Sequence, residues 1–396
     1  MIKHYMNRMR WIIFIGVFVF GLASGLGWLV SIPVLRYASL SSVLRSQLSS
    51  CSELPVVSIF EGSPQQRCYN KTLVAMVRSY GISSTISALK SYMKTPRGNF
   101  LQGMRCHALA HEIGNAAARF GTPSDVLMTQ CIGLCDFGSG RNPIVGLDLG
   151  CMNGAGHTWV LLNANIQDAF GKCAVPSIPE NVRQGCYHGI GHGLSERYGD
   201  DLTGAISQCL LLPNKEAKYQ CAHAIFMAPR QTSTMTNGLF DLIGYCRTLS
   251  DQVQASCFEF SGFMIFSSGK NAKEAMRVCD KTPEALQVQC RNRVGEAMYT
   301  LHKNPSDIQA CSEGVTGFAN DCVTGFVRTV IDTVNDTRGD LAIQACSALP
   351  EQLQYRCFEV VGVTLFLRYG EGVRQETCKK IISPAYVQAC LKSVEL

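Results

Sequence analysis

The chain has 396 residues, enough to bury two ordinary domain cores or to form one long repeat array. Its net charge of +6 is spread along the sequence without a dense Lys/Arg run or an RNA-binding motif, which argues against a nucleic-acid partner. Charged residues make up only 17% of the chain, below the usual value of about a quarter, and part of this deficit lies in the N-terminal segment.

The first predicted element is a membrane anchor. Residues Trp11–Leu35 are almost wholly apolar; this run exceeds the ~20 residues that span a bilayer and is long for the ~7–15-residue core of a cleaved signal peptide. Basic residues within Met1–Arg10 should keep that end in the cytoplasm. We therefore expect a cytoplasmic stub (1–10), a single-pass signal anchor (11–35), a linker (36–50) and an extracytoplasmic helical-repeat domain (51–396), periplasmic or extracellular. Cleavage near Ala23–Gly25 is the alternative.

The twenty cysteines agree with export, because an oxidising compartment would convert them to disulfides. From Cys173 onward they fall into pairs whose members are 11 to 13 residues apart, and successive pairs begin 32 to 37 residues apart. Such a period is typical of stacked helical hairpins. The pairs are 173/186, 209/221, 246/257, 279/290, 311/322, 346/357 and 378/390. The sequence therefore predicts an all-α, right-handed solenoid of about nine or ten hairpins.

Each unit repeats the same pattern. A short helix A ends near the first cysteine (Leu202–Leu212, Asp241–Arg247, Ala272–Asp280, Leu341–Ser347). After a polar loop, the second cysteine is expected to open a longer apolar helix B (Cys221–Ala228, Cys257–Phe266, Cys290–Leu301, Cys322–Val334, Cys357–Leu367). A disulfide across so short a loop should contribute roughly 2–3 kcal/mol. Because CxxC is absent and the spacing is too long for a zinc knuckle, structural disulfides are favoured over zinc clusters.

The pattern extends toward the N-terminus with irregularities. Cys51 and Cys68 form the first pair, followed by helices expected at 68–80, 84–93 and 101–119. The segment Leu127–Cys131 matches Ala205–Cys209, so Cys131 should pair with Cys151. Cys106 and Cys135 then remain as an extra bridge between adjacent units. The hairpin layout and period resemble those of the cysteine-rich Sel1-like repeat proteins, although the Sel1 consensus and its cysteine spacing are not present.

Six of the eight histidines lie between residues 107 and 223. Aligned on the second cysteine of each unit, position +2 holds Asn153, His188, His223 and Glu259, and position +6 holds His157 and His192. A one-residue shift at Cys106 places His107 and His111 at these same positions. All six histidines should then share one face of four consecutive B helices, in a histidine-rich block (about 101–229) ahead of scaffold repeats (about 230–396).

The stretch Gly185–Glu196 is unusual within that block. In a helix, His188, His192 and Glu196 form one column, because residues four apart lie on the same face. Three glycines, Gly189, Gly191 and Gly193, interrupt the column, and each costs roughly 1 kcal/mol relative to Ala. We expect another backbone or a cofactor to approach them closely. A bis-His haem over these glycines is one hypothesis, and the absence of CxxCH disfavours covalent haem. The alternative is a packed helix whose histidines are hydrogen-bonded in the core.

Two functions follow from this pattern. In the first, the six histidines (His107, His111, His157, His188, His192 and His223) bind one or two transition-metal ions, zinc, copper or iron, with carboxylate help from Glu112, Glu196 or Glu259. Such a protein could be a metal-dependent oxidoreductase or hydrolase, with Glu112 or Glu196 as proton carrier. In the second, the histidines form a structural polar seam and the concave face docks a peptide or protein. His111-Glu112 lacks the second histidine of HExxH, which excludes a zincin.

Overall fold

We describe the protein from a computed structural model, in which residues 42–43, 45–54, 64–95, 97–98, 101, 104–135, 149–163, 165–227, 241–313, 318–333 and 338–392 can be described. All regular structure in these residues is helical, as predicted. Among their helices none is both long enough and apolar enough to cross a membrane. The predicted anchor at 11–35 lies outside the described residues.

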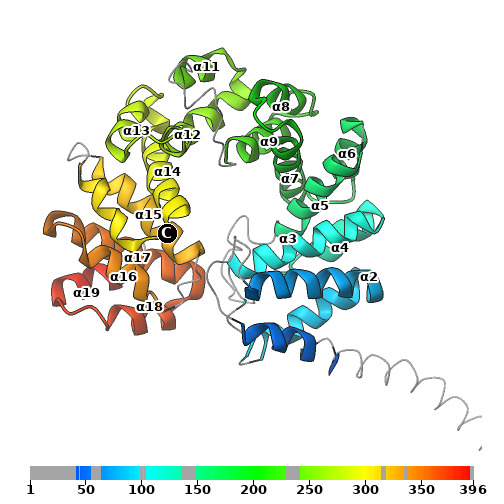
Figure 1. The fold of residues 1–396 in the computed structure, drawn as a ribbon, viewed down its shortest axis with the longest axis horizontal. Helices are drawn as coiled ribbons and strands as arrows, with labels where there is room; N and C mark the ends of the chain where they lie inside the picture. The colour runs from blue at the N-terminus through cyan, green and yellow to red at the C-terminus, as the bar shows by residue number, and fades with distance from the viewer. Residues whose placement is uncertain are drawn as a thin grey trace, which may run out of the picture.

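The described helices form ten consecutive hairpins that follow an arc, with the C-terminal hairpins returning toward the N-terminal ones (Figure 1). The A helices are 45–52, the second half of α2, α4 (Ser124–Cys131), α6 (Ile166–Cys173), α8 (Leu202–Cys209), α11 (Leu242–Thr248), α13 (Ala272–Cys279), the 3-10 helix η2 (Pro305–Glu313), α16 (Asp340–Ser347) and α18 (Glu371–Cys378). The B helices are the first half of α2 (Pro64–Met93), α3 (Met104–Arg119), α5 (Gly150–Leu162), α7 (Glu180–Tyr198), α9 (Lys215–Met227), α12 (Asp251–Ser267), α14 (Glu284–His302), α15 (Ala319–Thr333), α17 (Glu351–Tyr369) and α19 (Pro384–Leu391).

Helix α2 contains two of the predicted helices. The chain turns at Gly81, whose φ of 79° lies in the left-handed region that glycine adopts without a Cβ penalty. The helix before Gly81 belongs to the first hairpin and the helix after it to the second. The predicted boundaries on either side of this glycine are therefore correct within a few residues.

Helices B start earlier than predicted. The expectation that the second cysteine opens helix B is wrong, because α14 begins at Glu284 and α17 at Glu351, each six residues before that cysteine. Pro283 and Pro350 are the N-caps, with extended ψ angles of 138° and 145° that end the loop directly ahead of the helix. The second cysteine therefore lies in the second turn of helix B, where it can face helix A.

All ten predicted disulfides are present. Nine join helix A to helix B of the same hairpin, with Cα–Cα distances of 5.5 to 5.7 Å. The tenth, Cys106–Cys135, joins α3 to the segment after α4 and so links two adjacent hairpins. The described residues contain no free cysteine. Because the bridges lie inside thin hairpins, they limit the unfolded ensemble of each unit separately.

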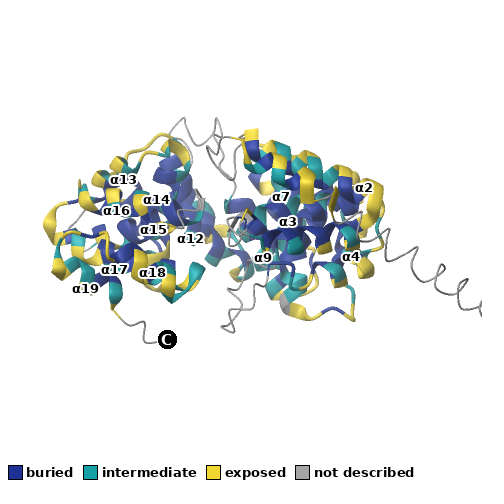
Figure 2. Cartoon of the chain, turned by 90° about the horizontal axis from the view of Figure 1, so that it is seen from below, coloured by how far each residue is buried: buried dark blue, intermediate teal, exposed yellow. Residues whose placement is uncertain are grey.

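The B helices pack on one another in chain order, and from α3 to α14 they form the inner row of the arc with the A helices outside them (Figure 1). The faces between neighbouring B helices are buried, and the outer surfaces of the A helices are exposed (Figure 2). Glycine permits this close packing. A Cβ at Gly295 would lie 1.9 Å from the Cys322 carbonyl oxygen, and one at Gly325 would lie 1.7 Å from that of Asn292. Neighbouring backbones thus touch, which brings side chains on the same face of successive B helices close together.

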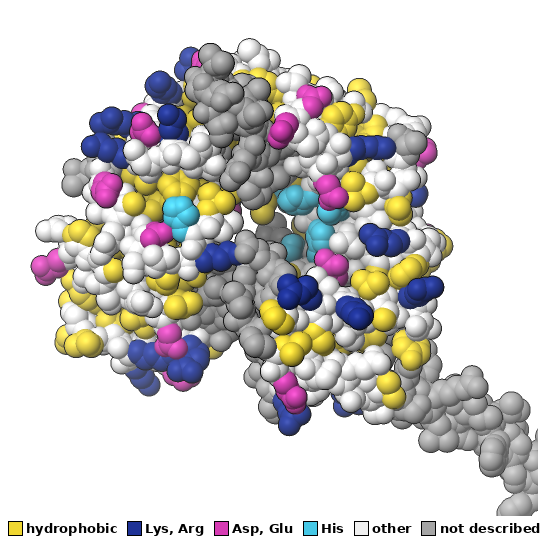
Figure 3. All heavy atoms as spheres, in the orientation of Figure 1, with side chains coloured by type: hydrophobic (Ala, Val, Ile, Leu, Met, Phe, Trp, Pro, Cys, Tyr) yellow, Lys and Arg dark blue, Asp and Glu magenta, His cyan; other side chains and the backbone are white. Residues whose placement is uncertain are grey.

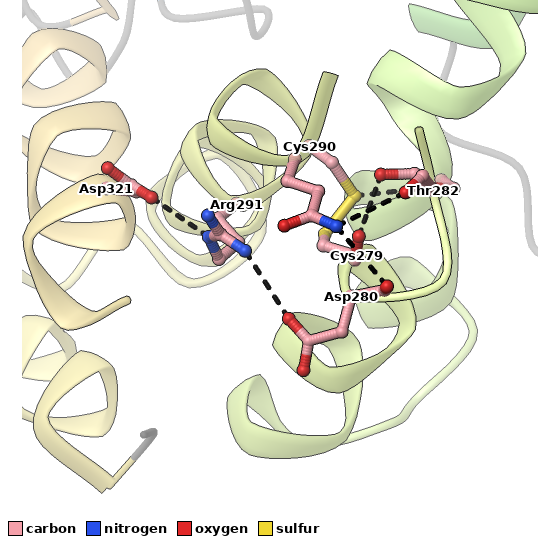
Figure 4. A network of polar contacts seen from close by, with 8 residues as sticks. Cys279, Asp280, Thr282, Cys290, Arg291 and Asp321 are labelled. Carbon is pink, nitrogen blue, oxygen red and sulfur yellow. Dashed lines mark hydrogen bonds and ion pairs between the residues drawn. A yellow bond between two sulfur atoms is a disulfide. The ribbon is translucent and has the colours of Figure 1, made fainter. Parts of the chain in front are cut away.

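Side chains also tie the loops to the helices. Three residues before the second cysteine, Gln65, Gln254, Gln287 and Gln354 each donate from Nε2 to carbonyl oxygens at the end of helix A or in the loop of their own hairpin, at 2.7 to 3.5 Å. Beside one such loop, the buried Arg291 donates to Asp321 at 2.9 Å on the next hairpin and to Asp280 at 3.4 Å (Figure 4). These bonds connect each loop to its B helix and one hairpin to the next.

Candidate functional site

The register of α3 differs from the predicted alignment. A Cβ at Gly156 would meet the Cys186 carbonyl oxygen, and one at Gly114 would meet that of Cys151, so Gly114 and Gly156 are equivalent. This makes His111, not His107, the counterpart of Asn153 and His188. Asn115 then takes the position of His157, and His107 lies one turn earlier. The one-residue shift at Cys106 was therefore wrong, although all three positions stay on one helix face because they are four residues apart.

The structure brings neighbouring histidines into pairs along this face. The ring centroids of His188 and His192 lie 4.8 Å apart, and those of His188 and His223 lie 5.4 Å apart. Farther back in the row, the rings of His111 and His157 are 5.7 Å apart. These contacts join imidazoles of α7 and α9 and, separately, imidazoles of α3 and α5. In the space-filling view, histidine side chains of the N-terminal half lie at the edge of the central opening (Figure 3).

The central imidazoles are neutral at pH 7. Burial, followed by the nearby His157, His223 and His107, lowers the pKa of His192 to about 3. Burial and the same kind of neighbour also lower the pKa of His188 and of His111 well below its usual value. A neutral imidazole has a free lone pair on one ring nitrogen, so these side chains are in the form that binds metal ions.

On each side of α7, one histidine has a carboxylate group near its Nε2 atom. Nε2 of His157 on α5 lies 2.8 Å from the carboxylate of Glu196, and Nε2 of His223 on α9 lies 3.7 Å from that of Glu259. In both rings Nδ1 is buried and has no hydrogen-bond partner. A buried nitrogen without a partner is uncommon in proteins, because it has lost water without replacing it. We will refer to these two atoms as the orphan nitrogens.

Glu112 and Glu196, the two candidate proton carriers, have different surroundings. Glu112 on α3 is partly buried, and burial raises its pKa although a hydrogen bond from Asn115 and the charge of His157 oppose this. Glu196 is exposed over 61% of its side chain and bonds His157 on the neighbouring helix rather than His192 in its own column. Only Glu112 therefore combines a raised pKa with a place beside the histidine face.

Helix packing accounts for the three glycines of α7. A Cβ at Gly189 would lie 1.9 Å from the Asn153 carbonyl oxygen, and one at Gly191 would lie 2.1 Å from that of Cys221. At Gly193 it would meet the Val160 side chain at 2.7 Å. Of the two expected neighbours of these glycines, another backbone or a cofactor, the structure shows the backbone. The positions hypothesised to face a haem are occupied by α5 and α9.

The imidazoles do not form a closed ligand set as they stand. Among the described residues, no group of three or more His, Cys, Asp and Glu side chains is gathered tightly enough to hold a metal ion. Among the same described residues, the rings of His188 and His192 make no hydrogen bond. A rotation of either ring would therefore not break a hydrogen bond. The arrangement provides paired neutral imidazoles and orphan nitrogens, but a metal ion would need ring rotations to be held.

A charged network that the sequence alone did not reveal continues the histidine face beyond α9. The carboxylate of Glu259 on α12 accepts from Arg293 on α14 and from the Tyr219 hydroxyl at 3.4 Å. Burial would raise the pKa of Glu259, but the nearby His223 and the charge of Arg293 outweigh it and lower that pKa to about 2. Glu259 is therefore ionised at neutral pH. The signal available in the sequence was position: Glu259 stands at the register of His188 and His223.

A comparison of this chain with protein families, with characterised proteins and with solved structures finds no match in any of the three.

Proposed function

We propose that the protein binds a transition-metal ion between α5, α7 and α9, using nitrogens of His157, His188, His192 and His223. The observation that supports this most directly is the pair of orphan nitrogens. A carboxylate at Nε2 holds the proton on that nitrogen and leaves Nδ1 as the lone-pair donor, which is the usual arrangement of a metal-ligating histidine. His157 has this arrangement at a distance of 2.8 Å, and His223, on the opposite side of α7, has a longer one at 3.7 Å.

The neutral state of the central imidazoles also supports the proposal. Two or more positively charged rings within 5.4 Å of each other would repel one another and a cation, and the lowered pKa of His188 and His192 removes this charge at pH 7. Zinc, copper and iron all accept imidazole, so the donor set leaves the metal open. His111, whose ring lies 5.7 Å from that of His157, and His107, one turn earlier on α3, are candidates for a second ion.

We place this site in a membrane-anchored, extracytoplasmic protein whose hairpins form a right-handed solenoid. The ten disulfides support an oxidising compartment, and the apolar run at 11–35 supports the anchor. If the protein is a metal-dependent hydrolase or oxidoreductase, Glu112 is the best-placed proton carrier, because burial raises the pKa of this partly buried carboxyl group and so favours its proton-bearing form.

Metal content tests the proposal. The full chain, purified with its disulfides intact, is incubated separately with zinc, copper and iron salts, freed of unbound ion by gel filtration, and measured by elemental analysis. At least one ion per chain is expected, and the His188→Ala/His192→Ala double variant should lose it. His302→Ala is the matched control, because His302 lies on α14, outside this histidine row, and bonds Asp307 on η2. Metal content near zero, or equal loss in the control, would refute the proposal.

The second candidate function is a binding scaffold, and the absence of a closed ligand set among the described residues favours it. In that case the histidines are a polar seam, and the inner surface of the B helices docks a peptide or protein. The double variant would then bind the partner less tightly, while elemental analysis of the unaltered chain would find no metal.

A further inference from the structure

Beyond the histidine row, the inner face of the B helices carries a group of arginines on α14, α15 and α17. Arg328 on α15 stands six residues after Cys322, the register position that His157 and His192 occupy in their own helices. Gly325, three residues earlier, touches the Asn292 backbone as Gly189 touches that of Asn153, so the register of α15 is the same as that of α7. Arg328 therefore lies on the same face as the histidines, in a later unit.

Every basic neighbour of Arg328 is already paired. Both oxygens of Asp332 accept from Arg368, at 2.7 and 2.8 Å. Arg293 donates to Glu259 at 3.0 Å and to Glu296 at 2.5 Å. Arg356 donates to Glu359 at 2.5 Å, and Lys392 bonds the same carboxylate at 2.8 Å.

The charges of this group do not balance. It contains five cationic side chains and four carboxylates, and the cation without a hydrogen bond or ion pair in the described part of the chain is Arg328. Its side chain is exposed to solvent, so a ligand can reach the guanidinium.

The pKa of Arg328 agrees with this excess of positive charge. Its partial burial, followed by the charges of Arg368, Arg356 and Arg293, lowers the pKa of Arg328, and the one carboxylate that opposes them is Asp332. Since Asp332 is engaged by Arg368, it cannot also neutralise Arg328 by a direct bond. A negative group bound from outside would oppose the repulsion that Arg368, Arg356 and Arg293 exert on Arg328.

We propose that Arg328 is the centre of an anion-binding site that receives a carboxylate or phosphate group of a ligand on the inner face of α15 and α17. A guanidinium presents paired N–H donors that match two oxygens of such a group. Arg368 and Arg356 add positive potential while remaining bound to their own carboxylates. The site does not require a metal ion at the histidine row.

The test is a titration of the full chain with two probes, inorganic phosphate and acetate, at constant ionic strength held with sodium chloride. Binding is followed by the side-chain Nε–H signals of arginines labelled with nitrogen-15. The signal of Arg328 should shift saturably, and Arg328→Gln should weaken binding at least tenfold. Arg277→Gln on α13 is the matched control, because Arg277 is an exposed arginine on an outer helix and has no hydrogen bond or ion pair among the residues that the structure describes.

The two probes distinguish the source of the anion. A saturable shift with either one supports the site, and the ratio of the two dissociation constants identifies the preferred group. A shift that grows linearly with either probe, as from screening alone, would overturn the proposal. So would equal binding by the unaltered chain and Arg328→Gln. Metal content should be the same in Arg328→Gln and the unaltered chain, which separates this result from the test of the histidine site.

Discussion

The glycine contacts of α7 lead to a sharp prediction about stability. Replacing Gly189 by alanine would place a Cβ 1.9 Å from the Asn153 carbonyl oxygen, where ordinary contact begins at 3.4 Å. The gap between α5 and α7 must therefore widen by about 1.5 Å at this point. The obstacle is backbone in the interior of a helix and cannot rotate away. Nor can α7 move freely to the other side, because Gly191 touches the Cys221 backbone of α9.

The expected magnitude follows from two opposing effects. Alanine gains roughly 1 kcal/mol over glycine in a helix interior. Inserting a methyl group into a closely packed interface costs typically 1–3 kcal/mol, and a rigid backbone neighbour places this site at the upper end. We expect a net loss of about 2 kcal/mol in the free energy of unfolding of the hairpins around α7. Gly171→Ala on α6 is the matched control: nothing lies within 4 Å of its Cβ position, so it should gain about 0.5–1 kcal/mol.

Hydrogen exchange read by mass spectrometry is the appropriate assay, because a repeat array need not unfold in one step. In Gly189→Ala, amides of α5 and α7 should lose protection, while those of α16 and α17, several hairpins away, should keep it. Global stability from urea unfolding of the non-reduced chain provides the second measurement. A Gly189→Ala protein as stable as the unaltered chain, or shifted in the same direction as Gly171→Ala, would refute the packing argument.

Three further predictions concern charge and hydrogen bonding. Below pH 6.5 the unfolded chain binds a proton at His192 that the folded chain does not bind, because burial lowers the pKa of His192 to about 3. Between pH 6 and 4, His192 alone should therefore lower the stability of the metal-free protein by about 1.4 kcal/mol per pH unit, and His188 and His111, whose pKa values are also lowered, should add to this slope. His192→Gln should reduce the slope by about the share of one proton in urea unfolding at several pH values. Arg291→Ala removes a buried guanidinium from Asp321 and should cost about 2–3 kcal/mol; an unchanged melting temperature would contradict it. Gln354→Ala removes the bond to the Leu349 carbonyl and should cost about 1 kcal/mol in the same melts, with equal stability as the contrary result.

The position of the candidate site could be predicted only in part. The spacing of His188 and His192 placed both on one face of a helix, and their rings do lie together. The alignment of His111 failed because it was made on Cys106, whose partner is in the next unit rather than in its own hairpin. Only the glycine contacts between α3 and α5 reveal the true register. The pairing of Glu196 with His157 was likewise hidden, because these two residues lie on different helices.

The sequence by itself determined the repeat, the helical class and the nine disulfides that lie within single hairpins. A hairpin closed by its own cysteines is a local structure, so a period of residues along the chain is enough to define it. Only the tertiary structure decided how one B helix meets the next, since that register depends on where two backbones can touch. It also decided which charges find partners. Whether Arg328 is paired depends on how α14, α15 and α17 lie against one another, and no spacing along one chain contains that information.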